Sequence, residues 1–278
     1  MTVQTGTPRR VHFVDDFAHG LDHTGPGASW RLRDTHIGVG GDGVVGRGED
    51  GVVIVPRSVH PGTGEPAFTP FEGSEPPDAF LRWTAYLETT ASTGFAGFDV
   101  SPERTLTVEA ELAVRAYGTW GAPASGAAAD PAGDVGRGAG ALMTFDRETG
   151  MVFDFCLTGS AVYALYERLP RAGRDERAFS VAVPLCDVRP GRPHHCALTH
   201  DPAAGTVRWV VDGRHTLTVG DLGHQQFDGA FVLWELPGEE RVAAPRQLAV
   251  GLTTMAASVQ GQGIRLGVRR VAVHSTSR

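Results

Sequence analysis

The stretch from Ala139 to Leu169 constrains the fold more than any other part of the sequence. It reads AGALMTFDRETGMVFDFCLTGSAVYALYERL, in which segments rich in Val, Phe, Tyr and Thr alternate with short groups of turn-forming residues. The first turn covers residues 146–150, and the second is centred on Gly159-Ser160. Tight turns between β-prone segments are typical of hairpins. The stretch therefore predicts a β-meander of three antiparallel strands.

The register of the second hairpin follows from pairing Thr158 with Ala161 across its tight turn. Phe153 and Phe155 then share one face, which their size marks as the core face. On the other face this register predicts the opposed pairs Asp154 with Leu165, Cys156 with Tyr163, and Val152 with Glu167.

The first hairpin is aligned by placing Phe145 opposite Met151. In this register Met143 and Phe145 join the core face, whereas Leu142 and Thr144 lie beside Asp154 on the other face. A slip of one residue would exchange the two faces, so this assignment depends on burial of the large aromatic side chains.

Short alternating or apolar segments continue along the whole chain. Residues 105–117, TLTVEAELAVRAY, alternate most clearly, with one apolar and one polar face. Asp212-Gly213 between residues 206–211 and 215–219 is a strong hairpin signal. Further strands are predicted at residues 11–17, 29–33, 52–55, 80–89, 178–184, 195–200, 231–234, 247–254 and 264–274.

This pattern predicts an all-β fold. No segment keeps a helical period, and the 37 Gly and 18 Pro are scattered between the apolar runs, as many tight turns require. Roughly a dozen strands call for two packed sheets. We predict that residues 1–278 form a single domain, a two-sheet antiparallel β-sandwich of the jelly-roll type.

Two segments rich in Gly and Pro, residues 56–79 and 118–138, are predicted as long loops. Loops of this length in compact domains are often functional. We expect them to cover a concave cleft lined by the 105–117 strand and the meander. Glu65, Phe68 and Trp120 would then contribute to the rim of the cleft or to a lid.

Composition excludes several classes of partner. The formal net charge is −7, which gives no basic surface for nucleic acid or for an anionic membrane. The amino terminus, MTVQTGTPRR, lacks the apolar core of a signal peptide, and no run approaches transmembrane length, so we expect a soluble cytoplasmic protein. Three cysteines without CxxC spacing indicate free thiols rather than disulfides.

The order of elements resembles that of the concanavalin A-like lectin/glucanase sandwiches. The segments that carry the resemblance are VDDF at residues 14–17, the meander ALMTFDRETGMVFDF, VRWVVDG, and the last strand RLGVRRVAVHS. PGTGEPAFT and the meander are also similar to an uncharacterised bacterial family with this sandwich, some of whose members are associated with natural-product biosynthesis. The resemblance implies a jelly-roll fold with a ligand site on the concave face of one sheet.

Glucanases of this fold use two glutamates that bracket an aspartate, a motif that is missing here. Glu109-Ala110-Glu111 lacks the central Asp. The nearest alternative is Asp154 with Glu167 on the neighbouring strand, because diagonal partners lie about 7–8 Å apart, compatible with an inverting pair.

Asp154 is the strongest candidate for acid–base chemistry, because apolar neighbours would raise the pKa of its carboxyl group. Tyr163 and Glu167 complete the predicted catalytic set, with Tyr163 as a hydrogen-bond donor to the ligand. The predicted ligand-binding residues are Glu109, Glu111, Leu142, Cys156, Leu165, Glu65, Phe68 and Trp120. Adjacent strand residues such as His195 and Cys196 point to opposite faces, so we predict no metal site there and no cofactor.

These features favour a small-molecule-binding sandwich that acts on a largely apolar substrate. The leading hypothesis is a cofactor-independent cyclase or isomerase of natural-product biosynthesis, in which Asp154 moves or polarises a proton. The alternatives are a carbohydrate-binding, lectin-like module and a glycoside hydrolase. The sequence does not decide the oligomeric state or the substrate.

Overall fold

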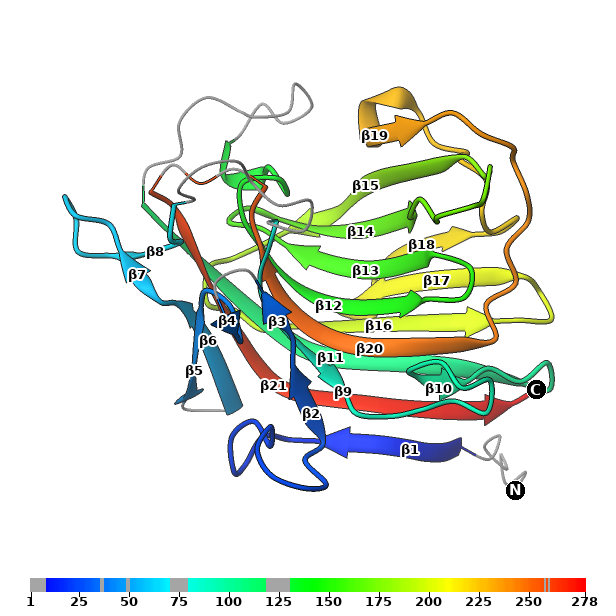
Figure 1. The fold of residues 1–278 in the computed structure, drawn as a ribbon, viewed down its shortest axis with the longest axis horizontal. Helices are drawn as coiled ribbons and strands as arrows, with labels where there is room; N and C mark the ends of the chain where they lie inside the picture. The colour runs from blue at the N-terminus through cyan, green and yellow to red at the C-terminus, as the bar shows by residue number, and fades with distance from the viewer. Residues whose placement is uncertain are drawn as a thin grey trace, which may run out of the picture.

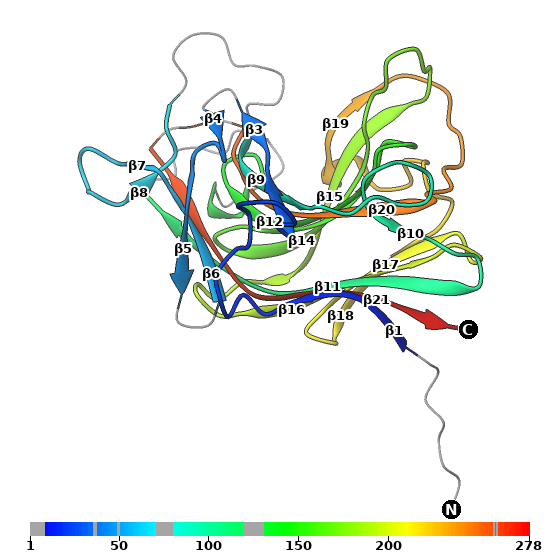
Figure 2. The ribbon, with the colours of Figure 1, turned by 60° about the horizontal axis from the view of Figure 1, so that its bottom comes forward.

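The computed structural model describes residues 9–35, 38–48, 51–70, 80–118, 131–257, 259 and 261–278. Two large β-sheets dominate it, and Figure 2 shows them stacked as two layers. The pairs between named strands are all antiparallel, and in the described residues the helical segments are two 3₁₀ turns, η1 (Pro131–Gly133) and η2 (Gly229–Phe231). The predicted all-β fold, a two-sheet antiparallel sandwich, is confirmed.

The first sheet has nine strands and contains the meander, so we call it the meander sheet (Figure 1). It curves away from the other sheet at β15 and β19 (Figure 2). Its strands in spatial order are β19 (Val232–Leu236), β15 (Ala178–Asp187), β14 (Ala161–Arg168), β13 (Met151–Leu157), β12 (Ala139–Asp146), β20 (Gln247–Met255), β9 (Leu81–Leu87) and β2 (Trp30–Leu32), with β10 (Phe98–Asp99) paired to β20.

The second sheet has eight strands and holds both ends of the described chain, so we call it the terminal sheet. Its spatial order is β18 (His215–Val219), β17 (Thr206–Val211), β16 (His194–Asp201), β11 (Arg104–Tyr117), β21 (Gly263–Ser277), β6 (Gly51–Pro56) and β5 (Gly43–Gly48), with β1 (Arg9–Asp15) paired to β21. Two short ladders complete the fold, β3 (Asp34–Thr35) with β4 (Gly38–Val39) and β7 (Ser58–Val59) with β8 (Pro66–Ala67).

The core lies between the two sheets. Alternation on β11 directs Leu106, Val108, Ala110, Leu112 and Val114 into it. The meander sheet contributes Phe153 and Phe155, which are fully buried. Trp209 on β17 crosses the interface, where its indole Nε1–H donates to the backbone carbonyl of Asp154 at 3.1 Å. The core packing therefore fixes β13, and with it the direction of the alternate side chains on the outer face.

The second hairpin has the predicted register. Thr158 donates its N–H to the Ala161 carbonyl, and Asp154 lies opposite Leu165. The pairs Cys156 with Tyr163 and Val152 with Glu167 are also as expected.

The predicted register of the first hairpin was wrong by one residue. Phe145 lies opposite Val152, because Asp146 still belongs to β12 and pairs with Met151 across a four-residue turn. The Asp146 carboxylate accepts the backbone N–H groups of two turn residues, Glu148 at 2.9 Å and Thr149 at 3.2 Å. The slip exchanges the faces of β12, so Leu142 packs in the core, whereas Met143 and Phe145 lie on the outer face.

The predicted cleft, lined by both the 105–117 strand and the meander, was also wrong. β11 is a central strand of the terminal sheet, paired with β16 and β21. Its polar side chains therefore lie on the outer face of the terminal sheet, with the whole sandwich between them and the outer face of the meander sheet. β5, which pairs with β6, was not predicted as a strand.

Candidate functional site

The candidate site is on the outer face of the meander sheet, where Asp154 projects from β13. Its neighbours along the strand, Phe153 and Phe155, are core residues, so alternation directs Asp154 outward. The carboxylate lies between two apolar clusters of this face. One contains Cys156, Leu165 and Ala182, and the other Met143, Phe145 and Val152.

Local hydrogen bonds hold the Asp154 carboxylate in place. Its Oδ1 accepts the backbone N–H of Thr144 at 2.8 Å, and the Thr144 hydroxyl donates to the Phe153 carbonyl. The paired residues of β12 and β13 skip Met143 and Thr144, so these side-chain bonds occur where the ladder is interrupted. Asp154 thus supports the strand as well as placing a carboxylate on the outer face.

Burial makes Asp154 costly to ionise. The side chain is almost completely buried, and desolvation raises its pKa well above the usual value, with a further contribution from Glu167 and an opposing one from the Thr144 N–H. Glu167 lies on β14, two residues along from Leu165, the direct partner of Asp154. The two carboxylates therefore occupy diagonal positions on neighbouring strands.

Glu167 carries the more accessible carboxylate of the two. Burial raises its pKa to about 7, although the hydroxyl of Ser180, its direct partner on β15, opposes the rise. The Glu167 charge raises the pKa of Asp154, whereas no Asp154 charge contributes to that of Glu167, so Asp154 keeps its proton while Glu167 ionises near neutral pH. Such a pair can supply one acid and one base.

The other predicted residues of the meander lie around this pair. Tyr163 is diagonal to Asp154 on the opposite side from Glu167, and its hydroxyl donates to the Gly133 carbonyl at 2.8 Å. Burial raises the pKa of the Cys156 thiol well above its usual value, so it is a poor nucleophile. Leu165 is buried beside it, but Leu142 lies in the core and not on this face.

Part of the predicted 118–138 loop covers this face. Val135 packs into the apolar cluster around Cys156 and Leu165, close to the Gly133 carbonyl bound by Tyr163. Leu233 of β19 packs against the same cluster from the edge of the sheet. Trp120 lies outside the described residues.

The residues expected on the cleft rim have other contacts. Phe68 is buried in the core, and the Arg82 guanidinium lies 5.5 Å from the centre of its ring. Glu65 accepts the backbone N–H of Gly118 at 3.1 Å, which joins the β7–β8 hairpin to the end of β11. Phe68 therefore anchors its loop, because burying a large apolar ring stabilises the folded chain more than leaving it exposed at a cleft rim.

Glu109 and Glu111 lie on the outer face of the terminal sheet and are not brought together with Asp154. Glu109 contacts Arg9 at 2.6 Å and His195 at 3.4 Å. Burial opposes its ionisation, but the Arg9 hydrogen bond and the nearby His274 lower the pKa of Glu109 overall. These surroundings are those of a surface ion-pair cluster.

Tyr86 is a part of the site that the sequence did not indicate. It projects from β9 onto the outer face, where its ring contacts Phe145 at 5.4 Å between centroids. Burial raises the pKa of Tyr86, Arg33 opposes the rise, and the Asp154 charge adds to it, which places the phenol within electrostatic range of Asp154. A Cβ on Gly251 would lie 2.7 Å from the ring, so the glycine provides the space for Tyr86. The alternation of residues 80–89 could have identified the face of the strand on which Tyr86 lies, but not the residues of other strands that surround it.

The described part of the chain contains no group of three or more His, Cys, Asp or Glu side chains arranged to hold a metal ion. It also contains no helix with the length and apolar character needed to cross a membrane.

These features define an antiparallel β-sandwich with a buried carboxylate pair on the outer face of one sheet. The chain belongs to the family of unknown function DUF6081, whose model matches residues 14–277. A search of curated proteins finds no match.

Several solved structures are similar to the chain at low sequence identity. Alginate lyase A1-II', a member of polysaccharide lyase family 7, has 10% identity and a TM-score of 0.47, with 84% of each chain covered. A Bacillus licheniformis β-glucanase has 13% identity and a TM-score of 0.48, covering 99% of this chain and 100% of that one. The protein of unknown function SO2946 from Shewanella oneidensis MR-1 has 9% identity and a TM-score of 0.43, covering 100% and 90%. Similarity at this level carries no information on activity.

Proposed function

We propose that the chain is a cofactor-independent acid–base enzyme that hydrolyses a glycosidic bond with the carboxylate pair Asp154 and Glu167. The observation that supports this most directly is the diagonal placement of two carboxylates whose pKa values are both raised. Diagonal strand positions are about 7–8 Å apart, within the range of about 6.5–9.5 Å between carboxyl groups that inverting hydrolysis requires.

In this mechanism the two carboxyl groups have different tasks. Asp154, which burial and the Glu167 charge keep protonated, donates its proton to the leaving oxygen. Glu167, the more accessible group, is ionised in the same state of the pair and takes a proton from the water that attacks the anomeric carbon. Tyr86, which is half-buried, supplies an aromatic ring on this face against which a sugar ring can pack.

The apolar surroundings support a second candidate, a cyclase or isomerase acting on an apolar substrate. Met143, Phe145, Val152 and Leu165 surround the carboxylates, and all four are buried. A carboxyl group with a raised pKa can protonate an alkene or move a proton along a carbon chain, and an apolar surface can hold such a chain in a reactive conformation.

One experiment separates these candidates from a binding module. Purified protein is incubated with a panel of oligosaccharides and a panel of polyene and terpenoid compounds, and both thermal stabilisation and product formation are measured. The hydrolase proposal predicts new reducing ends from a sugar that also stabilises the protein, with loss of product in Asp154→Asn and Glu167→Gln. Glu103→Gln, a change at an exposed carboxylate before β11, is the matched control and should retain activity.

Other results would contradict the hydrolase proposal in specific ways. Isomerised or cyclised products from the apolar panel would support the second candidate. Stabilisation by sugars without product would indicate a lectin-like module. Unchanged turnover in both carboxylate variants would exclude the pair from catalysis.

A further inference from the structure

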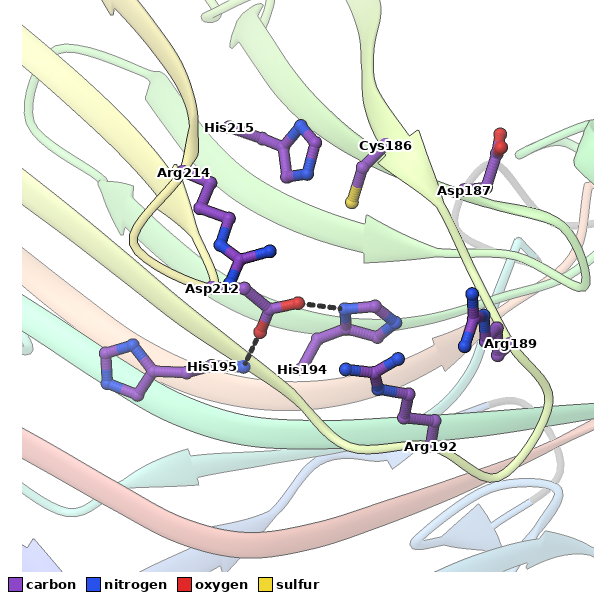
Figure 3. Close-up of a pocket in the computed structure, with 9 residues that line it drawn as sticks. All are labelled: Cys186, Asp187, Arg189, Arg192, His194, His195, Asp212, Arg214 and His215. Carbon is purple, nitrogen blue, oxygen red and sulfur yellow. Dashed lines mark hydrogen bonds and ion pairs between the residues drawn. The ribbon is translucent and has the colours of Figure 1, made fainter.

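A pocket lies at one end of the sandwich, apart from the carboxylate pair. It opens between the end of β15, the start of β16 and the β17–β18 turn (Figure 3). Its volume is about 610 Å³. A volume of a few hundred Å³ is typical of small-molecule sites. The pocket and the carboxylate site share β15, but Cys186 lines the pocket near the carboxyl end of that strand, whereas Ala182 belongs to the outer face.

The pocket has a net positive lining in an acidic protein, because its three arginines outnumber its two aspartates, Asp187 and Asp212. Arg189, Arg192 and Arg214 line it and are exposed, while the whole chain has a formal net charge of −7. Among the described residues their guanidinium groups have no ion-pair or hydrogen-bond partner. Figure 3 shows the three side chains arranged around the ring of His194. Guanidinium groups in such an arrangement match the oxygen atoms of an anion.

His194 supplies a buried polar atom that the protein leaves unsatisfied. Its side chain is only 6% exposed, and Nδ1 lies 2.9 Å from Oδ2 of Asp212. The other carboxylate oxygen of Asp212 accepts the backbone N–H of His195 at 2.9 Å. Burial opposes ionisation of Asp212, but these hydrogen bonds lower its pKa overall, so Asp212 is an acceptor and Nδ1 carries the hydrogen.

The second nitrogen of His194 is therefore the free one. Nε2 is buried and has no hydrogen-bond partner among the described residues. A buried polar atom without a partner is costly, and such atoms in folded proteins usually have a ligand or an ordered water. Its position in a pocket lined by arginines suits an anion that can also offer a hydroxyl hydrogen to a bare ring nitrogen.

We propose that this pocket binds the phosphoryl group of a small-molecule ligand. The arginines pair with the phosphoryl oxygens, and His194 completes the set, with Asp212 fixing the orientation of its ring. A phosphate suits Nε2 in either protonation state of the ring, because it offers P–O⁻ to an N–H donor and P–OH to a bare nitrogen. Burial, together with the charges of Asp212 and Asp187, raises the pKa of the Cys186 thiol, which makes it a poor nucleophile.

The experiment is a calorimetric titration of the whole protein with inorganic phosphate and with pyrophosphate, at an ionic strength held constant with sodium chloride. The proposal predicts saturable binding to one site. Arg189→Gln and Arg192→Gln should each weaken binding about tenfold, because each removes a charge-assisted hydrogen bond. Arg208→Gln is the matched control, since Arg208 is an exposed arginine of β17 outside the pocket.

Two results would overturn the proposal. One is the absence of saturable binding at constant ionic strength. The other is an equal loss of affinity in Arg208→Gln, which would indicate a general effect of charge. Asp154→Asn should bind phosphate as the wild type does, so the outcome is independent of the function proposed for the carboxylate pair.

Discussion

Glu167→Gln should make the stability of the protein increase relative to wild type as the pH rises. The raised pKa means that folding favours the protonated form of Glu167. Below about pH 4.5 both folded and unfolded chains are protonated at this position, and the carboxyl group adds no penalty. As the pH rises from there to about 7, the unfolded chain ionises first, so wild-type stability is lost across this window. Glutamine does not titrate, so the variant escapes this loss.

The structure gives the size of the effect. A shift from the model-compound pKa of 4.5 to about 7 corresponds to about 3 kcal/mol, at about 1.36 kcal/mol per pKa unit. Removing the Glu167 charge also relieves its repulsion of Asp154, which acts in the same direction. The difference in unfolding free energy between Glu167→Gln and wild type should therefore grow by about 3 kcal/mol between pH 4 and pH 8.

Urea denaturation of both proteins at pH 4, 5, 6, 7 and 8 measures this difference. The wild-type curve alone is not sufficient, because burial lowers the pKa of His200 to about 4. A lowered histidine pKa adds stability as the pH rises through the same window and masks the effect of Glu167. His200 is common to both proteins and cancels in the difference. A difference that stays constant with pH, or equals that of Glu103→Gln, would refute the reasoning.

Three further predictions concern stability, each measured by urea denaturation at pH 7. Asp154→Ala removes the acceptor of the Thr144 N–H on β12 and should cost about 1–3 kcal/mol, whereas Asp154→Asn retains an acceptor oxygen and should cost less. Equal losses in the two variants would show that this hydrogen bond does not stabilise the strand. Gly251→Ala should cost about 1–3 kcal/mol because its Cβ would meet both the Tyr86 ring and the Ala85 carbonyl oxygen, and no loss would show that both contacts relax freely. Asp42→Asn should cost about 3–5 kcal/mol, because it removes the negative charge from the fully buried ion pair with Arg82. An unchanged stability would contradict a charged pair at this position.

Local patterns predicted most of the strands. The segments 206–211 and 215–219 match β17 and β18, since Asp212 and Gly213 both take the positive φ angles that this tight turn requires. Alternation also assigned the two faces of β11 correctly, with Val108 in the core and Glu109 outside.

The register of the first hairpin could not be predicted from the sequence, for a physical reason. All residues of β12 are buried, because both of its faces carry apolar side chains. A strand of this kind has no polar face to identify, so Leu142 and Met143 are equally good core residues on sequence alone. The decisive feature is Asp146, which ends the strand and also holds the turn.

The composition of the candidate site depends on pairings between distant parts of the chain. Alternation does not say which sheet a strand joins, and β11 pairs with β21, more than a hundred residues later. This pairing takes Glu109 away from Asp154, and the position of β9 beside β20 brings Tyr86 close to it. Asp154 and Glu167 were predictable as neighbours because one tight turn sets their register.

The central claim is that Asp154 and Glu167 form a carboxylate pair that holds a proton at neutral pH. Its most direct test is a pH titration of the side-chain carboxyl carbons by NMR, with ¹³C-labelled glutamate and with Glu167→Gln to assign the signal. The account predicts a midpoint for Glu167 near pH 7, retained in Asp154→Asn because burial rather than an Asp154 charge raises this pKa. A midpoint near 4.5 in the wild type would show an ordinary solvated carboxylate and contradict the account.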